Sequence, residues 1–93
     1  MSYYVYMILT KINNRYISYV GYTNNLKKRL SLHNSSKGAK FTRGKFWKLI
    51  YSKKYLTKSL ALKEKYKLKK DYKLRSEIKK EYLKNENLNT FTL

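Results

Sequence analysis

Five side chains have types and spacings that could do chemistry: two tyrosines, an arginine, a histidine and a glutamate. The tyrosines belong to two short triplets, and the arginine and histidine follow four residues apart, one turn of a helix. Hydrolysis of a phosphodiester needs an activated water, positive charge on the non-bridging oxygens and a stabilised leaving alkoxide. Arginine can supply that charge, and the other groups can hold or move protons. The residues are Tyr6 in Tyr4-Val5-Tyr6, Tyr19 in Tyr19-Val20-Gly21, Arg29, His33 and Glu64.

The supply of carboxylates limits the kind of metal site that this chain can build. Residues 1–50 contain no acidic side chain, whereas a two-metal site needs several carboxylates around ions about 4 Å apart. One Mg²⁺ held by one carboxylate, water and phosphate oxygens is what the composition permits. Glu64 is the best candidate ligand, because it lies three residues after Ala61 and four before Leu68 on a helical stripe that faces inward.

Charge identifies the kind of partner. The 93 residues include 23 Lys and Arg against 5 Asp and Glu, a formal charge of +18, and such a protein is expected to meet a polyanion.

A hydrophobic fraction of 42% predicts a folded chain. The absence of cysteine excludes disulfides and thiolate metal sites. No stretch approaches the roughly 20 apolar residues of a membrane span, so we expect a soluble, intracellular protein, cytoplasmic or nuclear.

The elements that must position the five residues follow from their patterns. Residues 3–9 and 15–21 are rich in aromatic and β-branched side chains and predict a hairpin with its turn at Asn13-Asn14. Thr23 or Asn24 can cap a helix to about His33, with Leu26, Leu30 and His33 facing inward. Residues 46–51 predict a third strand. Residues 57–83 predict helix, broken near 70–73, and residues 85–93 a frayed tail. The order predicts an α+β fold in one domain, residues 1–84.

Taken together, these residues resemble the GIY-YIG nuclease family, with the two tyrosine triplets in place of the family's two. The likeness continues through residues 22–30 and 33–44 and covers about residues 3–75. It is closest to small stand-alone bacterial and viral members, related to the nuclease domain of Slx-type endonucleases. The first triplet lacks its Gly, and Tyr22 stands where many members have Lys. The resemblance implies a three-stranded antiparallel sheet flanked by helices, with a helical C-terminal part.

The resemblance also implies roles. Tyr19 would activate the water and Tyr6 would orient the network. Arg29 would bind the scissile phosphate, His33 would relay a proton, and Glu64 would hold Mg²⁺, for which Mn²⁺ can substitute. The expected protein is a single-metal DNA endonuclease for flaps, branches, junctions or single strands, as in DNA repair or recombination. The loop residues expected to bind nucleic acid are Lys40, Thr42, Arg43 and Lys45.

Each position also has an interpretation without catalysis. The tyrosines can be core aromatics, Arg29 a solvated helix residue, His33 a helix cap and Glu64 an ion-paired surface residue. The main alternative function is therefore a catalytically inactive member of the fold that binds nucleic acid, or a subunit of a larger nuclease complex. A basic peripheral membrane protein would need a broad apolar helix face, which the lysine-rich C-terminal segment does not offer.

Overall fold

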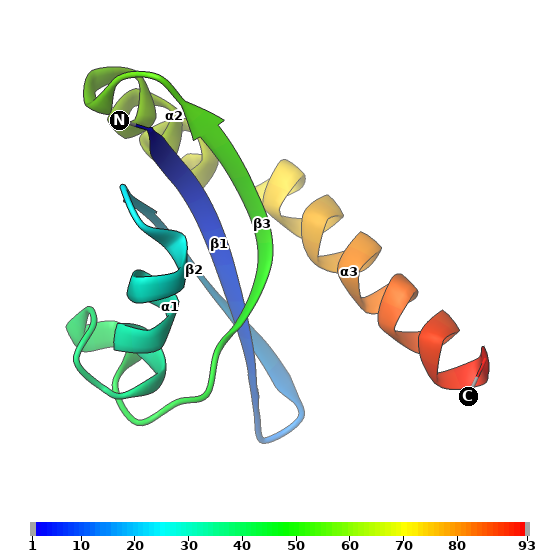
Figure 1. Cartoon of the computed structure of the whole chain (residues 1–93). Helices are drawn as coiled ribbons and strands as arrows, with labels where there is room; N and C mark the ends of the chain where they lie inside the picture. Colours follow the sequence, from blue (N-terminus) through cyan, green and yellow to red (C-terminus); the bar gives the residue numbers. More distant parts are fainter. Residues whose placement is uncertain (1, 93) are drawn as a thin grey trace.

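A three-stranded antiparallel sheet in the order β2-β1-β3 forms the centre of the protein (Figure 1). The computed structural model describes residues 2–92, with side chains described up to Glu86. Strand β1 (Tyr3–Ile12) is joined to β2 (Arg15–Thr23) by Asn13 and Asn14, whose φ angles are 51° and 65°. Two central residues with positive φ make the tight hairpin turn that matches strand twist, and asparagine tolerates that conformation. The predicted hairpin is confirmed, with both strands longer than expected.

Strand β3 (Lys48–Tyr55) pairs with β1, so the third strand starts and ends later than the predicted range 46–51. Trp47 explains the late start. Its backbone N–H donates to Oδ1 of Asn34 at 2.6 Å, and its carbonyl accepts from Nδ2 of the same residue at 3.0 Å. Because the Asn34 amide occupies both backbone groups, Trp47 is fixed against the first helix and not in the ladder. No feature of the sequence marked this pairing.

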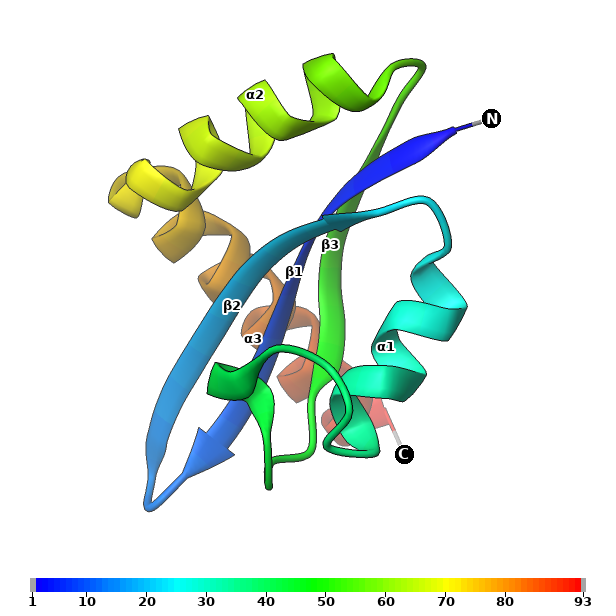
Figure 2. The same ribbon diagram turned by 90° about the vertical axis from the view of Figure 1, so that its left-hand side faces the viewer.

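Helices cover both faces of the sheet, and Figure 2 shows α1 and α2 on opposite sides of it. Helix α1 (Leu26–Asn34) covers the face that contains Tyr6, Ile8 and Trp47. Helix α2 (Lys58–Lys70) packs through Ala61 and Leu68 on the face that contains Val5, Met7 and Val20. Successive residues of a strand point to opposite faces, so the alternation along β1 divides the core into two layers.

Helix ends follow local hydrogen bonds. Asn25 caps α1, its side chain accepting from the Lys28 N–H at 3.1 Å, so the predicted caps Thr23 and Asn24 are wrong by one or two residues. The Thr23 hydroxyl accepts instead from the N–H of Asn25 at 3.1 Å. The predicted break in the C-terminal helix lies at Asp71, whose side chain accepts from the Leu74 N–H at 3.0 Å and starts α3 (Tyr72–Thr92).

Helix α3 runs diagonally away from the end of α2 (Figure 1). Its backbone is helical to Thr92, whereas side chains after Glu86 lie outside those described. That residues 85–93 form a frayed tail therefore stays a prediction. In the part of the chain that the structure describes, no helix is long and apolar enough to cross a bilayer.

Candidate active site

Four of the five predicted residues meet on the face of the sheet covered by α1. Tyr6 comes from β1, Tyr19 from β2, and Arg29 and His33 from α1. The Tyr6 hydroxyl lies 2.8 Å from Nε2 of His33 and accepts from Nε of Arg29 at 3.4 Å. The edge of the Tyr19 ring meets His33, with ring centroids 5.3 Å apart at 61°. We call these four residues the tyrosine–histidine cluster.

The hydrogen bonds fix the protonation of His33. The Thr42 hydroxyl donates its only proton to the carbonyl of Ala39 at 2.8 Å, so it can only accept from Nδ1 of His33, also at 2.8 Å. Nδ1 therefore carries the ring proton. Nε2 is then an acceptor, and the Tyr6 hydroxyl donates to it. The chain of donors runs from Tyr6 through His33 and Thr42 to the backbone.

Thr42 was predicted to bind nucleic acid, and the structure corrects this. The residue is wholly buried, at 0% exposure, within the short 3-10 helix η1 (Lys40–Thr42). Its carbonyl accepts from the indole N–H of Trp47 at 3.0 Å, so the buried Trp47 holds it in place. Thr42 thus supports His33 from inside the protein and presents no side chain to a ligand.

Burial and charge set the protonation states in the cluster. Burial raises the pKa of Tyr6 above that of an ordinary phenol, although the hydrogen bond and charge of Arg29 oppose the shift. Burial, with the nearby charge of Arg29, lowers the pKa of His33, so its imidazole is neutral at pH 7. The hydrogen bond to Tyr6 raises the pKa of Arg29, and Tyr19 contributes to the same shift. The cluster therefore holds one permanent cation beside two hydroxyls and a neutral imidazole.

Two glycines leave the space that the cluster occupies. Gly21 pairs with Tyr6 across β1 and β2, and a Cβ built on Gly21 would collide with the Tyr6 hydroxyl. A Cβ on Gly38 would lie 2.6 Å from Nδ1 of His33. Neither glycine has a positive φ. The close approach of Tyr6 and His33, and not an unusual backbone conformation, therefore explains why both positions are glycine. The supporting roles of Gly38 and Thr42 were missed, although both lie in the run of residues 33–44 that carried the resemblance.

A polar cavity of about 450 Å³ opens beside Arg29, at the ends of β1 and β2. Lys58 at the start of α2 lies in its wall, and Tyr22 lies there too. The ammonium of Lys65 is 5.5 Å from the centre of the Tyr22 ring. Helix α2 thus brings two cations, Lys58 and Lys65, to the corner where Tyr22 lies. The full lining is Tyr3, Tyr22, Thr23, Asn24, Arg29 and Lys58.

Glu64 does not join the cluster. It lies on α2, across the sheet, with its carboxylate 3.6 Å from the ammonium of Lys67. Its charge acts on Tyr51 and Tyr55 of β3, where it adds to the effect of burial in raising the pKa of each phenol. Lys65, the next residue on the helix, is the one that faces β2.

The side chains around the cluster do not fit a divalent cation. Both ring nitrogens of His33 are already used by Tyr6 and Thr42, and the other cluster residues are two phenols and a guanidinium. Among the side chains that the structure describes, no three His, Cys, Asp or Glu residues gather as a ligand group. A hard cation prefers carboxylate and carbonyl oxygens, and in this arrangement Glu64 is on the other face of the sheet.

The cations predicted to bind nucleic acid lie around η1. Lys40 and Arg43 are exposed, whereas Lys45 is half-buried and folds back on its own loop. Its ammonium donates to the carbonyls of Phe41 and Arg43 at 3.2 and 3.4 Å. Lys40 and Arg43 are therefore more available than Lys45 to bind phosphates.

Comparison with known proteins agrees with this geometry. The GIY-YIG catalytic domain profile matches residues 2–87. The chain is 42% identical over 69 residues to the UPF0213 protein OB0043 of Oceanobacillus iheyensis, covering 73% of this chain and 77% of that protein. It is 41% identical over 70 residues to a UPF0213 protein of Bacillus licheniformis, covering 74% and 69%.

A solved structure is also similar: the solution structure of the UPF0213 protein BH0048 from Bacillus halodurans is 33% identical. The match covers 83% of this chain and 80% of that one, with a TM-score of 0.44. The nearer relation to Slx-type endonucleases stays a prediction. The sheet, the cluster and a profile match over nearly the whole chain lead to one conclusion: the chain belongs to the GIY-YIG family, alongside the UPF0213 proteins.

Proposed function

We propose that this protein is an endonuclease that hydrolyses phosphodiester bonds of DNA at the tyrosine–histidine cluster. Membership of the GIY-YIG family points to a nuclease. The observation that carries the proposal is the hydrogen-bonded chain from Arg29 through Tyr6 to a neutral, buried His33. A buried network this fully bonded holds a guanidinium in one place, which is what charge stabilisation of a phosphoryl transition state requires.

The four residues divide the chemistry between them. The scissile phosphate lies in the polar cavity beside Arg29, whose guanidinium faces its non-bridging oxygens. Tyr19 is only half-buried, so its phenolic oxygen can contact the attacking water and, as a phenolate, accept its proton. Water adds to phosphorus in line, the bond to the 3′ oxygen breaks, and that oxygen takes up a proton from solvent, while the proton accepted by Tyr19 returns to solvent. The products are a 5′-phosphate and a 3′-hydroxyl.

Tyr6 and His33 act as positioning residues. Tyr6 is 2% exposed and His33 wholly buried, so neither reaches bulk water. The Tyr6 hydroxyl gives its proton to Nε2 of His33 in a hydrogen bond and keeps a lone pair for Nε of Arg29. His33 therefore acts through Tyr6, whose hydroxyl it holds beside Arg29. Replacing Tyr6 by Phe would remove this hydrogen-bond partner of Arg29, so the guanidinium would be held less firmly in position.

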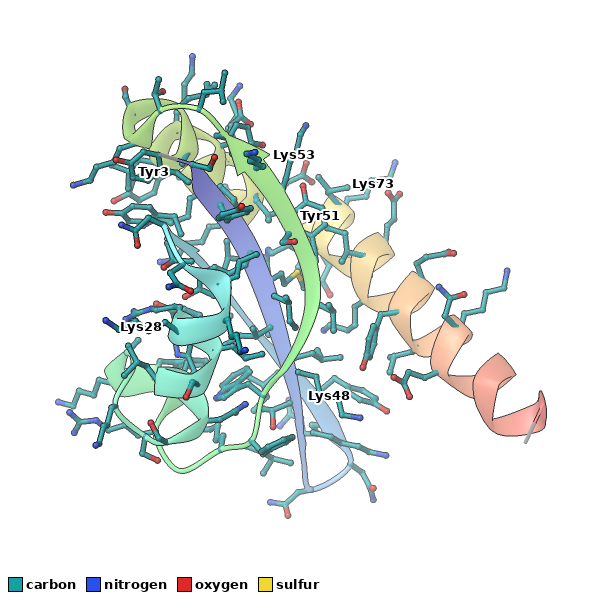
Figure 3. All side chains as sticks on the ribbon, in the orientation of Figure 1. Tyr3, Lys28, Lys48, Tyr51, Lys53 and Lys73 are labelled. Atoms are coloured by element: carbon teal, nitrogen blue, oxygen red, sulfur yellow. The ribbon has the colours of Figure 1, made fainter. Side chains whose placement is uncertain are left out.

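The surface supports a substrate recognised by shape and charge. Figure 3 shows Lys28, Lys53 and Lys73 on α1, β3 and α3, directed to different sides of the protein. Lysines spread in this way contact phosphates without reading bases, and the affinity they give falls steeply with salt. We therefore propose flaps, branches, junctions or single strands as substrates.

Divalent metals are typical of GIY-YIG nucleases. For this chain, dependence on Mg²⁺ or Mn²⁺ and the role of Glu64 as its ligand remain proposals, because Glu64 is apart from the cluster.

The test is cleavage of labelled single-stranded, flap, four-way-junction and plain duplex DNA across a range of Mg²⁺ and Mn²⁺ concentrations. Arg29→Gln is compared with Lys28→Gln, which removes the same charge from an exposed neighbour on α1. We expect the first to lower the cleavage rate by about 100-fold or more and the second to change mainly the salt dependence. Equal cleavage rates for the two variants would show that Arg29 has no special role in catalysis.

A second candidate function is nucleic-acid binding without turnover, as a partner of another subunit. The separation of Glu64 from the cluster favours it. Under this alternative, wild type and Glu64→Gln bind DNA equally and neither gives a product with any metal.

A further inference from the structure

A second cavity, of about 310 Å³, lies at the edge of the sheet formed by β2, on the route from the cluster to the junction of α2 and α3. It starts at Tyr19, the residue proposed to activate water, and reaches Arg75 in the first turn of α3. We call it the β2-edge groove. Its lining is Ser18, Tyr19, Val20, Phe41, Lys69 and Arg75.

Phe41 gives the groove an aromatic wall. The side chain is 53% exposed although it belongs to the short η1 helix that holds His33 from behind. Its ring stacks on Tyr19, with centroids 6.1 Å apart and planes 21° from parallel. A large aromatic ring that is this exposed and that stacks on a ring of the cluster is a platform on which a nucleobase can stack.

At the other end of the groove, a hydrogen-bond donor of Arg75 lacks an acceptor. Its Nε–H is buried and has no hydrogen-bond partner among the described residues. A buried donor left unpaired is destabilising, and Arg75 as a whole is half-buried and lines the groove, where an acceptor supplied by a ligand can meet its guanidinium. Lys69 adds a second, exposed cation, and the residues that line the groove include no acid. Phosphate oxygens are the acceptors that fit an ammonium and a guanidinium fork.

We propose that the β2-edge groove binds the strand adjoining the scissile phosphate: one unpaired base stacks on Phe41, and a neighbouring phosphate accepts from Arg75 and Lys69. The inference rests on the proposed function for its direction, since it takes the cluster as the point of cleavage. A base within a duplex is already stacked and cannot reach Phe41. The groove therefore selects single strands and flaps over plain duplex.

The position of the base is tested by photocrosslinking. An oligothymidine of twelve nucleotides with one 5-iodouracil is irradiated with the full-length protein, and tryptic peptides are identified by mass spectrometry. We expect the label in Phe41–Arg43, or on Tyr19. Crosslinks confined to Phe46–Lys48 would overturn the proposal, because Phe46 is 70% exposed but lines a different cavity.

The contribution of each end is tested by binding, read as fluorescence anisotropy of the same oligothymidine without the iodinated base. Phe41→Leu should weaken binding about tenfold, whereas Phe46→Leu should leave it within about twofold. Arg75→Gln should lower the slope of log affinity against log salt by about 0.7. Its control, Arg15→Gln, removes a charge at the exposed hairpin tip.

These readouts separate the inference from the proposed function. If wild type does not cleave but the crosslink and both binding effects are found, the groove stands and the endonuclease fails. If Phe41→Leu and Arg75→Gln bind as tightly and with the same salt slope as their controls, the groove fails whatever the cleavage assay shows. Circular dichroism of each variant confirms that it is folded, and Lys69→Gln repeats the test at an exposed position.

Discussion

The Thr42→Val variant tests the hydrogen-bonded chain, because it keeps the size of the side chain and removes its hydroxyl. In the wild type, Nδ1 of His33 donates to Thr42 at 2.8 Å, and Thr42 donates to Ala39. Without the hydroxyl, the buried Nδ1–H has no acceptor, which costs about 1–3 kcal/mol. At about 2 kcal/mol, the melting temperature of a domain of this size falls by roughly 8–16 °C.

The same substitution changes the tautomer of His33. A hydrogen bond worth about 1.4 kcal/mol to the Nδ1–H form shifts the ratio of tautomers about tenfold when it is lost. His33 is the only histidine in the chain, so long-range ¹H–¹⁵N correlation of the imidazole is unambiguous. We expect protonated Nδ1 and unprotonated Nε2 in the wild type, and a mixture in Thr42→Val.

The matched control is Thr10→Val. Thr10 is 8% exposed and its hydroxyl donates to the carbonyl of Phe46 at 2.6 Å, away from His33. It should lose comparable stability and keep the wild-type tautomer. A wild-type imidazole protonated at Nε2 would refute the whole direction of the chain from Tyr6 to Thr42.

Three further perturbations follow from the same geometry. Gly21→Ala places a methyl group against the Tyr6 hydroxyl, so thermal unfolding should show a loss of about 1–3 kcal/mol, and an unchanged melting temperature would mean that the strands adjust freely. Asn34→Ala frees both backbone groups of Trp47 and should cost about 1–3 kcal/mol in urea unfolding; a loss below 0.5 kcal/mol, on the order of a surface change, would contradict this. Burial lowers the pKa of His33 in the folded state, so below pH of about 6.5 the unfolded chain binds a proton that the folded chain excludes, and the free energy of unfolding should fall from pH 7 to pH 5. Constant stability over that range in urea titrations would count against a neutral, buried imidazole.

Much of the fold could be predicted because the local signals are strong. The Asn13-Asn14 turn, the apolar run of β1 and the long segment without glycine or proline after Thr57 each specify their element. The α+β class and the three-stranded sheet are confirmed. The start of β3 was missed because a side chain from α1, Asn34, takes the backbone groups of Trp47, a tertiary contact that no local pattern reveals.

The site could be predicted only in part, for a similar reason. Tyr6, Arg29 and His33 lie together because strand alternation and helical spacing place them on facing surfaces. Spacing also placed Glu64 on an inward stripe, but it could not say which face of the sheet that stripe covers. The helix turns Glu64 toward β3 and Lys65 toward β2, one residue apart.

Thr42 shows the limit of composition as a guide. A threonine between Lys40 and Arg43 in a basic loop is typical of a phosphate contact, yet its hydroxyl is used inside the protein. Only the packing of η1 against Trp47 reveals this role.

The central claim, that the tyrosine–histidine cluster cleaves DNA, is tested most directly by single-turnover cleavage of a flap substrate by wild type and Tyr19→Phe, with binding measured in parallel. We predict a cleavage product from the wild type and a rate at least about 100-fold lower for Tyr19→Phe, with affinity unchanged. Equal cleavage by the two proteins, or tight binding with no product from either, would contradict it.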